Sequence, residues 1–474
     1  MTNKQPQQYA IGMVGLGVMG RNLLLNMADH GFPAAGYDKD PAKVEALRRE
    51  SKERDVCGAA DIKEFIGFLR QPRAVMMLVP AGAPVDEVIR DLLPRLTRGD
   101  LIIDGGNSHF TDTDLRARTL AEHGIQFLGV GVSGGEHGAR HGPSIMPGGP
   151  PRAYELVQPI LEAIAAQVDG VPCVTWLGPG SAGHYVKMVH NGIEYAVMQM
   201  IAESYDIMKR GLGLTDDELG DEYERWNRGE LNSYLVEITM QIFRRVDEKT
   251  GKRLIDVILD EARQKGTGMW MSQDAMELHV PVPTIDAAVA MRNLSAFKSE
   301  REASRKKFAR RIPGFSGDRT AFLTRLRDAM YAGTILTHAQ GMAQLWKASQ
   351  SYAYNLHLES VARIWRGGCI IRAKLLEPVR AAFRAKPDLP NLLLDPVLGD
   401  AVMARQENLR AVVRSAVESG ITAPALMGSL SYFDAYRSEW MPSNLIQAQR
   451  DYFGAHTYER IDAKGTFHTQ WEKE

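Results

Sequence analysis

Cysteine is scarce in this sequence, with three residues in a chain of 474, at Cys57, Cys173 and Cys369. They stand alone, with no CxxC pair and no even set, which argues against a disulfide scaffold and against a thiolate zinc site. Such sparing use of cysteine fits a reducing compartment. We therefore expect a cytoplasmic protein.

An excess of charge of either sign is also missing. The chain has 57 lysines and arginines against 58 aspartates and glutamates, so no overall attraction draws it to nucleic acid or to an anionic membrane. A site for an anionic ligand has to be a local cluster of cations. We expect small-molecule partners, with neither nucleic acid nor membrane among them.

Long hydrophobic runs are absent as well. No apolar stretch approaches the roughly 18 residues that a membrane span needs, and residues 1–8 are polar rather than the charged and then apolar start of a signal peptide. The length allows two to four domains, each large enough to bury a core. These features predict a soluble, intracellular protein.

Short β-rich runs and helix-like stretches divide the chain into three predicted parts. Residues 1–180 alternate the two, as in a parallel sheet covered by helices. Residues 181–440 carry apolar residues at spacings of three and four, as amphipathic helices do, and residues 441–474 lack sustained periodicity and are predicted to form an extended tail. The predicted strands are Ala10–Val14, Ala34–Tyr37, Ala74–Val79, Leu101–Asp104, Ile125–Gly129 and Val174–Leu177.

A glycine-rich loop follows the first predicted strand. Gly15, Gly17 and Gly20 form a GxGxxG pattern between the strand Ala10–Val14 and a helix. Such glycines allow a tight turn, close approach of a pyrophosphate and close packing of the helix on the strand. Because the loop opens a βαβ unit, residues 1–180 are predicted to be an α/β Rossmann-like dinucleotide-binding domain, with an ordinary glycine-rich turn as the alternative.

An acidic residue, Asp38, ends the second predicted strand. A carboxylate there accepts hydrogen bonds from a ribose 2′-hydroxyl and repels a 2′-phosphate, which favours NAD over NADP. Lys39 argues the other way, because a cation can pair with a phosphate, and Asp40 weakens that argument. The alternative is that residues 38–40 are a solvated turn.

A strip of polar side chains lies on the helix predicted to begin after Ser181. At about 100° per residue, Lys187, His190, Asn191 and Glu194 share one arc, beside an apolar arc that can anchor the helix. Alone, such a strip is more often a solvated face. Directly after a dinucleotide domain, however, an amine and a carboxylate are placed as the base and the acid of a dehydrogenase. These roles require the pKa of the lysine to be lowered and that of the glutamate to be raised.

Seven stretches resemble those of decarboxylating 6-phosphogluconate dehydrogenases, and the resemblance covers essentially the full length of the chain. They are Ile103–Ser108, Gly131–Glu136, Met146–Gly149, Lys187–Tyr195, Gln264–Gly268, Trp365–Arg372 and Gln447–Glu459. The resemblance implies oxidative decarboxylation of 6-phospho-D-gluconate to D-ribulose 5-phosphate and CO2 with reduction of NAD or NADP, in the pentose phosphate pathway and gluconate utilization. It implies no metal ion.

The catalytic pair of this family falls on Lys187 and Glu194. By this resemblance Lys187 is the base at the C3 hydroxyl and then the acid at the carbonyl oxygen as CO2 leaves, and Glu194 is the acid that protonates C1. The resemblance places cofactor contacts in the glycine loop, after the second and third strands and in two later loops. These residues are Gly15, Gly17, Met19, Gly20, Asp38, Lys39, Val79, Asn107 and Glu136.

The implied substrate contacts comprise the loop 133–135, the polar strip and a cluster of cations. They are Asn107, Ser133, Gly134, Gly135, His190, Asn191, Tyr195, Lys265, Thr267, Arg292, Arg450 and His456. The resemblance assigns the loop to the substrate carboxylate, the strip to hydroxyls and the residues from Tyr195 onward to the phosphate. In the family the tail enters the other subunit, which implies a homodimer with Arg450 and His456 completing the partner's site; a tail folded on its own chain is the alternative.

The chain departs from the family around the cofactor. Members that use NADP generally carry Asn-Arg-Thr where this chain has Asp38-Lys39-Asp40, and a lysine where it has Pro80. A carboxylate repels a nearby phosphate by roughly 1–4 kcal/mol at surface dielectrics. We predict that NAD is used at least as well as NADP.

Two other functions stay open. A β-hydroxyacid dehydrogenase acting on an unphosphorylated acid would share the nucleotide loop and the lysine, but such enzymes are shorter and lack Lys265-Gly266-Thr267 and Arg450. A non-catalytic dinucleotide-binding protein is the second alternative. The joint presence of Lys187 and Glu194 argues against it.

Overall fold

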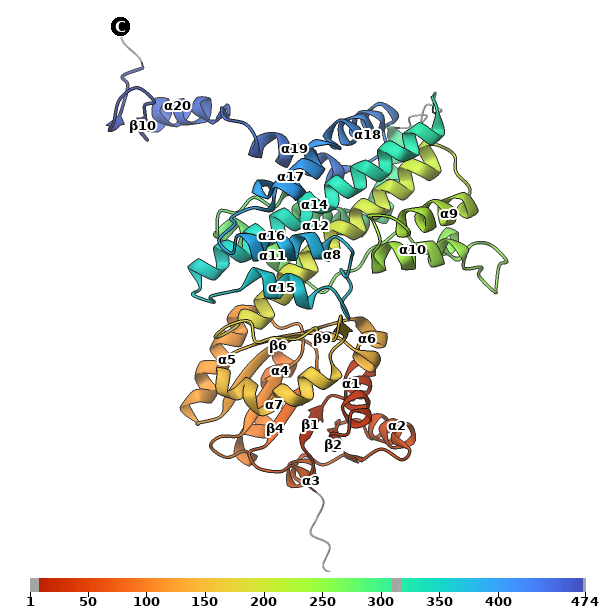
Figure 1. Ribbon diagram of the computed structural model, residues 1–474, viewed down its shortest axis with the longest axis vertical. Helices are drawn as coiled ribbons and strands as arrows, with labels where there is room; N and C mark the ends of the chain where they lie inside the picture. The colour runs from red at the N-terminus through yellow and green to blue at the C-terminus, as the bar shows by residue number, and fades with distance from the viewer. Residues whose placement is uncertain (1–7, 309–314, 316, 472–474) are drawn as a thin grey trace, which may run out of the picture. The chain divides into compact units, whose positions relative to one another are not determined.

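A computed structural model describes residues 8–308, 315 and 317–471. The chain divides into two compact units after Ser429, and Figure 1 shows the elements of both. The first unit contains a sheet covered by helices and then a long helical part, which confirms the predicted fold class. No helix within the described ranges is long and apolar enough to cross a membrane.

The first unit begins with a seven-stranded sheet of order β3-β2-β1-β4-β5-β6-β7. The first six strands pair in parallel, and β7 runs antiparallel to β6. The strands are β1 Ile11–Val14, β2 Ala34–Tyr37, β3 Val56–Ala59, β4 Ala74–Met77, β5 Leu101–Asp104, β6 Gln126–Ser133 and β7 Ser144–Gly148. Because the strand order reverses between β1 and β4, the crevice beyond their carboxyl ends is where such sheets bind ligands.

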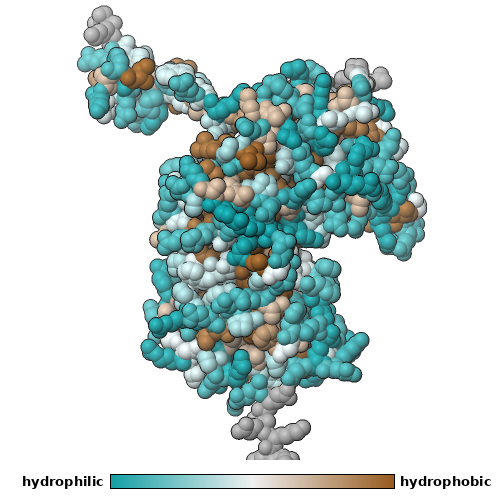
Figure 2. Space-filling model, in the orientation of Figure 1, coloured by the Kyte–Doolittle hydropathy of each residue, from teal (hydrophilic) through white to brown (hydrophobic). Residues whose placement is uncertain are grey.

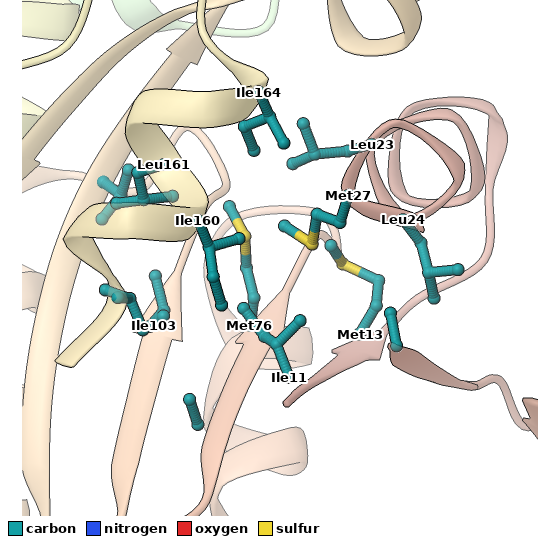
Figure 3. Close-up of a cluster of buried hydrophobic side chains, with 14 of the residues drawn as sticks. Ile11, Met13, Leu23, Leu24, Met27, Met76, Ile103, Ile160, Leu161 and Ile164 are labelled. Carbon is teal, nitrogen blue, oxygen red and sulfur yellow. The ribbon is translucent and has the colours of Figure 1, made fainter. Parts of the chain in front are cut away.

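Helices cover both faces of this sheet (Figure 1). They are α1 Val18–Asp29, α2 Pro41–Ser51, α3 Ile62–Phe68, α4 Ala83–Leu92, α5 Phe110–Glu122, α6 Gly135–His141 and α7 Pro151–Ile164. Successive strand residues point to opposite faces, so Met76 and Ile103 pack with α1 and α7, while Val75 and Ile102 pack into a second cluster with α3, α4 and α5. Figure 3 shows the first of these clusters, with strand, α1 and α7 side chains meeting in one layer.

The rest of the first unit is helical. Its helices are α8 Ala182–Asp206, α9 Asp216–Asn227, α10 Tyr234–Arg244, α11 Thr267–Glu277, α12 Pro283–Ser295, α13 Lys298–Lys307, α14 Arg319–Ser351, α15 Leu358–Ile364, α16 Leu376–Ala385, α17 Pro396–Met403, α18 Gln406–Ser419 and the first residues of α19 Pro424–Tyr436. Helix α8 is buried on nearly every side, because α11, α12, α14 and the strands β6 and β7 pack against it.

Gly183 lets α8 lie directly on the sheet. A Cβ atom at this position would stand 2.3 Å from the carbonyl oxygens of Gly129 and Met146, so any larger residue would push the helix away. The start of α8 is therefore fixed to the sheet by backbone contact. At its other end the helix finishes in a π-helical turn over Ile207–Gly211.

The second unit contains α20 Ser443–Gly454 and a short hairpin of β10 Tyr458–Glu459 with β11 Thr466–Phe467. The carboxylate of Asp451 organises this unit, because it accepts hydrogen bonds from the amides of Thr457 (2.9 Å) and Thr469 (3.0 Å) and from the rings of His468 (2.9 Å) and Trp471 (2.9 Å). The sequence prediction of a tail without regular elements missed this helix and hairpin.

The strand predictions differ from the structure in four places, one of which is the short antiparallel pair of β8 Gln167–Val168 and β9 Val171–Pro172, which was not predicted. The strand predicted at Val174–Leu177 is wrong, since Val174 makes a single bridge to Ile145. Strand β3 was missed because its four residues include a glycine and a cysteine, and β7 was missed because it contains Pro147. Both are short strands near an end of the sheet, where weak strand formers are tolerated.

Candidate active site

The glycine loop joins β1 to α1 as predicted. Gly20 packs so closely that a Cβ atom there would lie 1.9 Å from the carbonyl oxygen of Gly15, whereas a Cβ atom on Gly17 would meet nothing within 4 Å. The loop is therefore tight on its protein side and open at the helix N-terminus, where a pyrophosphate binds in this type of domain. Met19 is half-buried beside the cluster under α1.

A cleft of about 280 Å³ adjoins this loop and is lined by residues following β2 and β4 and by one side of α4. The lining includes Gly15, Gly17, Asp38, Lys39, Lys43, Val79, Pro80, Glu87 and Asp91. The cofactor positions that the sequence indicated after the second and third predicted strands, which are β2 and β4 of the structure, thus share one cleft. Lys43, Glu87 and Asp91 were not singled out from the sequence.

Both lysines of this cleft are paired with carboxylates. Lys39 lies 3.1 Å from a carboxylate oxygen of Asp91, and Lys43 lies 3.3 Å from one of Asp38. Asp38 also accepts hydrogen bonds from the amides of Leu16 (2.8 Å) and Asp40 (3.0 Å). The Asp38 carboxylate therefore ties the glycine loop to the end of β2.

Three residues of the polar strip of α8, Lys187, His190 and Asn191, belong to one hydrogen-bonded chain inside the protein. The Lys187 amine donates to Asn191 Oδ1 (2.6 Å), and Asn191 Nδ2 donates to the Thr267 hydroxyl (3.1 Å). His190 Nδ1 lies 3.1 Å from the same Asn191 Oδ1, which can only accept, so Nδ1 carries the proton. His190 Nε2 then accepts from the Ser133 hydroxyl (3.2 Å). Residues of β6, α8 and α11 are thereby brought together.

Burial shifts the pKa values of this strip in the directions that acid–base chemistry needs. Burial lowers the pKa of the Lys187 amine, although the charges of Glu194 and Cys369 act in the opposite direction. Burial raises the pKa of the Glu194 carboxyl, although Lys187 and Arg292 favour its charged form. Burial and the charge of Lys187 hold the pKa of His190 well below its usual range. The surroundings thus shift all three groups toward their neutral forms.

The predicted phosphate-binding residues of the first unit lie on α8, α11 and α12. The Arg292 guanidinium stacks 3.6 Å from the centre of the Tyr195 ring, and its charge reaches Glu194. Thr267 opens α11, and Lys265 is exposed two residues earlier. These side chains supply the local cations that the neutral composition of the chain required.

The remaining predicted residues are placed in three ways. Gly134 and Gly135 join β6 to α6, and Glu136 is exposed on the first turn of α6. Asn107 is exposed just after β5. Arg450 and His456 are exposed in the second unit.

The segment following α15 supplies neighbours that had no predicted role. The amide of Ile370 donates to the Ser133 hydroxyl (3.5 Å), and the Trp365 ring stacks edge-on against His190 with centroids 5.6 Å apart. Cys369 is fully buried and raises the pKa of Lys187. The only signal in the sequence was that this stretch resembles the family.

Two family models match the chain. The NAD-binding domain of 6-phosphogluconate dehydrogenase matches residues 10–178, and the C-terminal domain of 6-phosphogluconate dehydrogenase matches residues 183–471.

Curated and solved proteins are similar over the full length. The chain is 50% identical to the NADP(+)-dependent, decarboxylating 6-phosphogluconate dehydrogenase of Bacillus subtilis, over 98% of this chain and 99% of the relative. It is 52% identical to the decarboxylating 6-phosphogluconate dehydrogenase of Synechococcus elongatus, with the same coverage. Plasmodium falciparum 6-phosphogluconate dehydrogenase, solved in its apo form and in complexes with NADP+ and with 6-phosphogluconate, superimposes with a TM-score of 0.94 at 43% identity, covering 97% of this chain and 100% of that one.

Proposed function

The chain belongs to the 6-phosphogluconate dehydrogenase family, and we propose that it oxidises and decarboxylates 6-phospho-D-gluconate to D-ribulose 5-phosphate and CO2, with reduction of NADP or NAD. One observation carries the proposal. A buried lysine with a lowered pKa and a half-buried glutamate with a raised pKa share one face of α8. A site with a neutral amine and a protonated carboxyl has a base and an acid available together.

The Lys187 amine acts first as the base. It takes the proton of the C3 hydroxyl, and the nicotinamide of a bound dinucleotide supplies the acceptor for the hydride that leaves C3. The hydrogen bond to Asn191 Oδ1 (2.6 Å) aims the amine along the strip, so its remaining N–H and its lone pair face away from that amide. The product of this step is a 3-keto acid.

Decarboxylation uses the proton that Lys187 has gained. The C1–C2 bond of the keto acid breaks and its electron pair becomes the C2–C3 double bond of an enediol, while Lys187 returns the proton to the C3 oxygen. Glu194 then protonates the carbon that lost CO2, which is C2 of the substrate and becomes C1 of the product, as Lys187 removes the proton from the C3 oxygen. The result is the ketone of D-ribulose 5-phosphate.

The substrate-binding residues are proposed from the same geometry. The loop Ser133-Gly134-Gly135 presents a hydroxyl and backbone amides that suit the carboxylate. His190 and Asn191 suit hydroxyls, because both are buried, neutral and hydrogen-bonded to one another. Tyr195, Lys265, Thr267 and Arg292 suit the phosphate, with Asn107 between substrate and nicotinamide.

The reaction is tested with the purified protein, 6-phosphogluconate and either dinucleotide, following reduced nicotinamide and CO2 in the same sample. We expect one CO2 for each reduced nicotinamide. Reduction without CO2, or activity on unphosphorylated acids alone, would favour a β-hydroxyacid dehydrogenase. Neither product would favour a non-catalytic dinucleotide-binding protein.

We propose that NAD is used at least as well as NADP. The cleft beside the glycine loop places Asp38, Glu87 and Asp91 against two lysines, and both lysines already pair with a carboxylate. A 2′-phosphate would therefore meet no unpaired lysine among the residues described there and would be repelled by carboxylates. The 2′-hydroxyl of NAD is a donor that Asp38 can accept.

Steady-state kinetics with both cofactors test this preference, and a kcat/KM that strongly favours NADP would contradict it. Asp91→Asn is the diagnostic variant. It frees Lys39 without touching Asp38 or the glycine loop, so we expect kcat/KM for NADP to rise relative to NAD by about 1.5- to fivefold, as for one exposed charge pair. Asp55→Asn, a change of the same kind outside the cleft lining, is the matched control and should leave the ratio unchanged.

We also propose that the protein is a homodimer in which the second unit completes the partner's site. The second unit exposes large apolar side chains, namely Leu445 (61% exposed), Ile446 (58%), Phe453 (73%) and Ile461 (91%). Figure 2 shows hydrophobic atoms among the hydrophilic ones of this unit. Exposed apolar patches of this kind mark surfaces that bind another chain.

Mixed dimers test this arrangement. Lys187→Met and Arg450→Ala chains are each expected to be inactive as pure dimers. Random mixing restores one intact site in each mixed dimer, which returns about a quarter of the wild-type activity. If the tail serves its own chain, mixing restores nothing.

A further inference from the structure

In the loop after β5, the side chain of Asn107 is exposed while its neighbours are buried. Asn107 is exposed, whereas Asp104 and Ser108 are 1% and 4% exposed. The Asp104 carboxylate accepts from the Gly106 amide (3.0 Å) and from the Ser108 hydroxyl (2.6 Å), so it closes a small ring of hydrogen bonds around Asn107. The backbone beneath Asn107 is thereby fixed by side chains that face away from solvent.

Arg116 of α5 holds this ring from behind. Its guanidinium donates to the Ser108 hydroxyl (3.3 Å) and lies 3.7 Å from the Asp104 carboxylate, and its other nitrogens reach Asp86 of α4 (2.6 Å) and the carbonyl oxygen of Gly82 (3.1 Å). The Arg116 side chain is only 6% exposed. One buried guanidinium, carried by the middle of α5, thus joins the loop to the start of α4, in a planar geometry that lysine cannot reproduce.

His184 joins the same loop to α8. His184 Nε2 lies 3.0 Å from the main-chain oxygen of Asp104, and Nδ1 lies 2.7 Å from the Thr113 hydroxyl. Burial lowers the pKa of His184, so the ring is neutral and its single proton is on Nε2, because the carbonyl oxygen can only accept. His184 stands one turn before Lys187 on the same helix.

We propose that Arg116 and His184 are positioning residues that hold Asn107 at a fixed distance and orientation relative to Lys187. The inference rests on the proposed function, in which Asn107 lies between substrate and nicotinamide and Lys187 is the base. Hydride transfer needs donor and acceptor carbons within a narrow range of distance and angle, and a displacement of about 1 Å costs roughly 10²-fold in rate. Loosening either link lets the Asn107 loop move relative to the amine without removing a group that touches the substrate.

The test compares Arg116→Met, His184→Leu and the milder Ser108→Ala with a matched control. Arg73→Met is that control, because Arg73 pairs with Asp100 (3.0 Å), a carboxylate as buried as Asp104, at the opposite end of β5. We expect kcat to fall about tenfold or more in the first two variants and less in Ser108→Ala. The isotope effect on kcat with substrate deuterated at C3 should rise, since hydride transfer becomes slower than the other steps. Arg73→Met should lower the melting temperature alone.

Conservative variants separate positioning from simple destabilisation. Arg116→Lys keeps the charge and should have a higher kcat than Arg116→Met. His184→Gln keeps a donor for the Asp104 carbonyl and should have a higher kcat than His184→Leu. An isotope effect that stays at the wild-type value in Arg116→Met and in Ser108→Ala would overturn the proposal.

Hydrogen exchange distinguishes a failure of this inference from a failure of the proposed function. Absence of turnover on 6-phosphogluconate in the wild-type protein would refute the function. The positioning role is then decided by amide exchange over residues 105–108, which should be faster in Arg116→Met and His184→Leu than in Arg73→Met. Equal exchange in all three variants would overturn it.

Discussion

In the state that the proposed reaction needs, a proton that Lys187 ordinarily carries is bound by Glu194 instead. The pair with a neutral amine and a protonated carboxyl has the same total charge as the ordinary pair of ammonium and carboxylate. Their pKa values therefore belong to the pair, and a pH profile reports on both residues together. Burial lowers one pKa and raises the other, which increases the share of molecules in the reactive form.

Replacing Lys187, the proposed base, should remove the first proton transfer. We expect Lys187→Met to lower kcat by about 10²–10⁴-fold, the usual contribution of a positioned base. Substrate binding should be largely retained, because methionine fills a similar volume and the phosphate-binding cations stay in place. Isothermal titration with 6-phosphogluconate and initial-rate measurements check the two statements. Near-normal turnover would refute the role of Lys187.

Removing the acid shifts the pH dependence of the base. The Glu194 carboxylate favours the charged form of Lys187 and so raises its pKa against the larger effect of burial. In Glu194→Gln the pKa of Lys187 should fall further, and the acidic limb of log kcat/KM, where the amine becomes protonated, should move to lower pH. Initial rates across the pH range test this on the residual activity. A limb that moves to higher pH contradicts the electrostatic argument.

At the level of single residues, the sequence was enough to select the polar strip but could not reveal its environment. The arc of Lys187 and Glu194 follows from helical periodicity, whereas burial depends on how β6, α11 and α14 pack on α8. The ion pairs of Lys39 and Lys43 also depend on packing, since their partners are the side chains of separate elements. Cys369 could not be connected with Lys187 because 182 residues separate them along the chain.

Helix α8 links the sheet at its start to α19 near its end. The Glu203 carboxylate accepts hydrogen bonds from the amides of Ala425 (2.8 Å) and Leu426 (2.9 Å) at the start of α19. Burial raises the pKa of Glu203 to about 7, although these amides and Gln199 favour its charged form. Near neutral pH this buried carboxyl titrates in the folded protein.

The stability contributed by Glu203 should fall as pH rises. A carboxyl whose pKa is raised from 4.5 to about 7 on folding binds more protons in the folded state between these values, so the free energy of unfolding decreases across that window by roughly 3 kcal/mol. Glu203→Gln does not titrate. We therefore measure the free energy of unfolding of both proteins in urea at pH 5 and pH 8. The value for Glu203→Gln minus that for the wild type should be larger at pH 8 than at pH 5. An identical pH dependence of the two proteins would refute this.

At the level of elements, periodicity and flanking glycines predicted five of the six parallel strands, all but β3, and the helical character of the second part. Strand β7 could not be predicted because Pro147 disfavours a strand unless a neighbour such as β6 provides the pairing. Helix α20 was missed because its apolar residues do not bury one face within the chain. A surface helix is recognised in a sequence by apolar residues at spacings of three and four, which form the face that packs on the core.

At the level of the whole molecule, the second unit depends on one buried carboxylate. Burial by itself would raise the pKa of Asp451, but hydrogen bonds from His468, Thr469, Trp471 and Thr457 hold it well below its usual range. The contribution of this group to the stability of the unit is present above the ordinary pKa of aspartate and is lost only as pH falls through the lowered value.

Asp451→Asn should loosen the second unit without unfolding the first. Asparagine replaces one acceptor oxygen with a donor, which cannot satisfy the amides and rings that converge there. We expect faster amide exchange over residues 443–471 and a loss of activity, while the main melting transition stays within a few degrees of the wild type. Exchange that remains slow in the variant would show that other contacts order the unit.

The order of the strands separates two properties of the enzyme. Asp38 follows β2, and Lys187 packs behind β6, four strand positions away in the sheet, or roughly 19 Å at the usual strand spacing. Substitutions that far apart have nearly additive effects. The choice of dinucleotide can therefore drift in evolution, or be exchanged in the laboratory, while the proton chemistry on α8 is inherited unchanged.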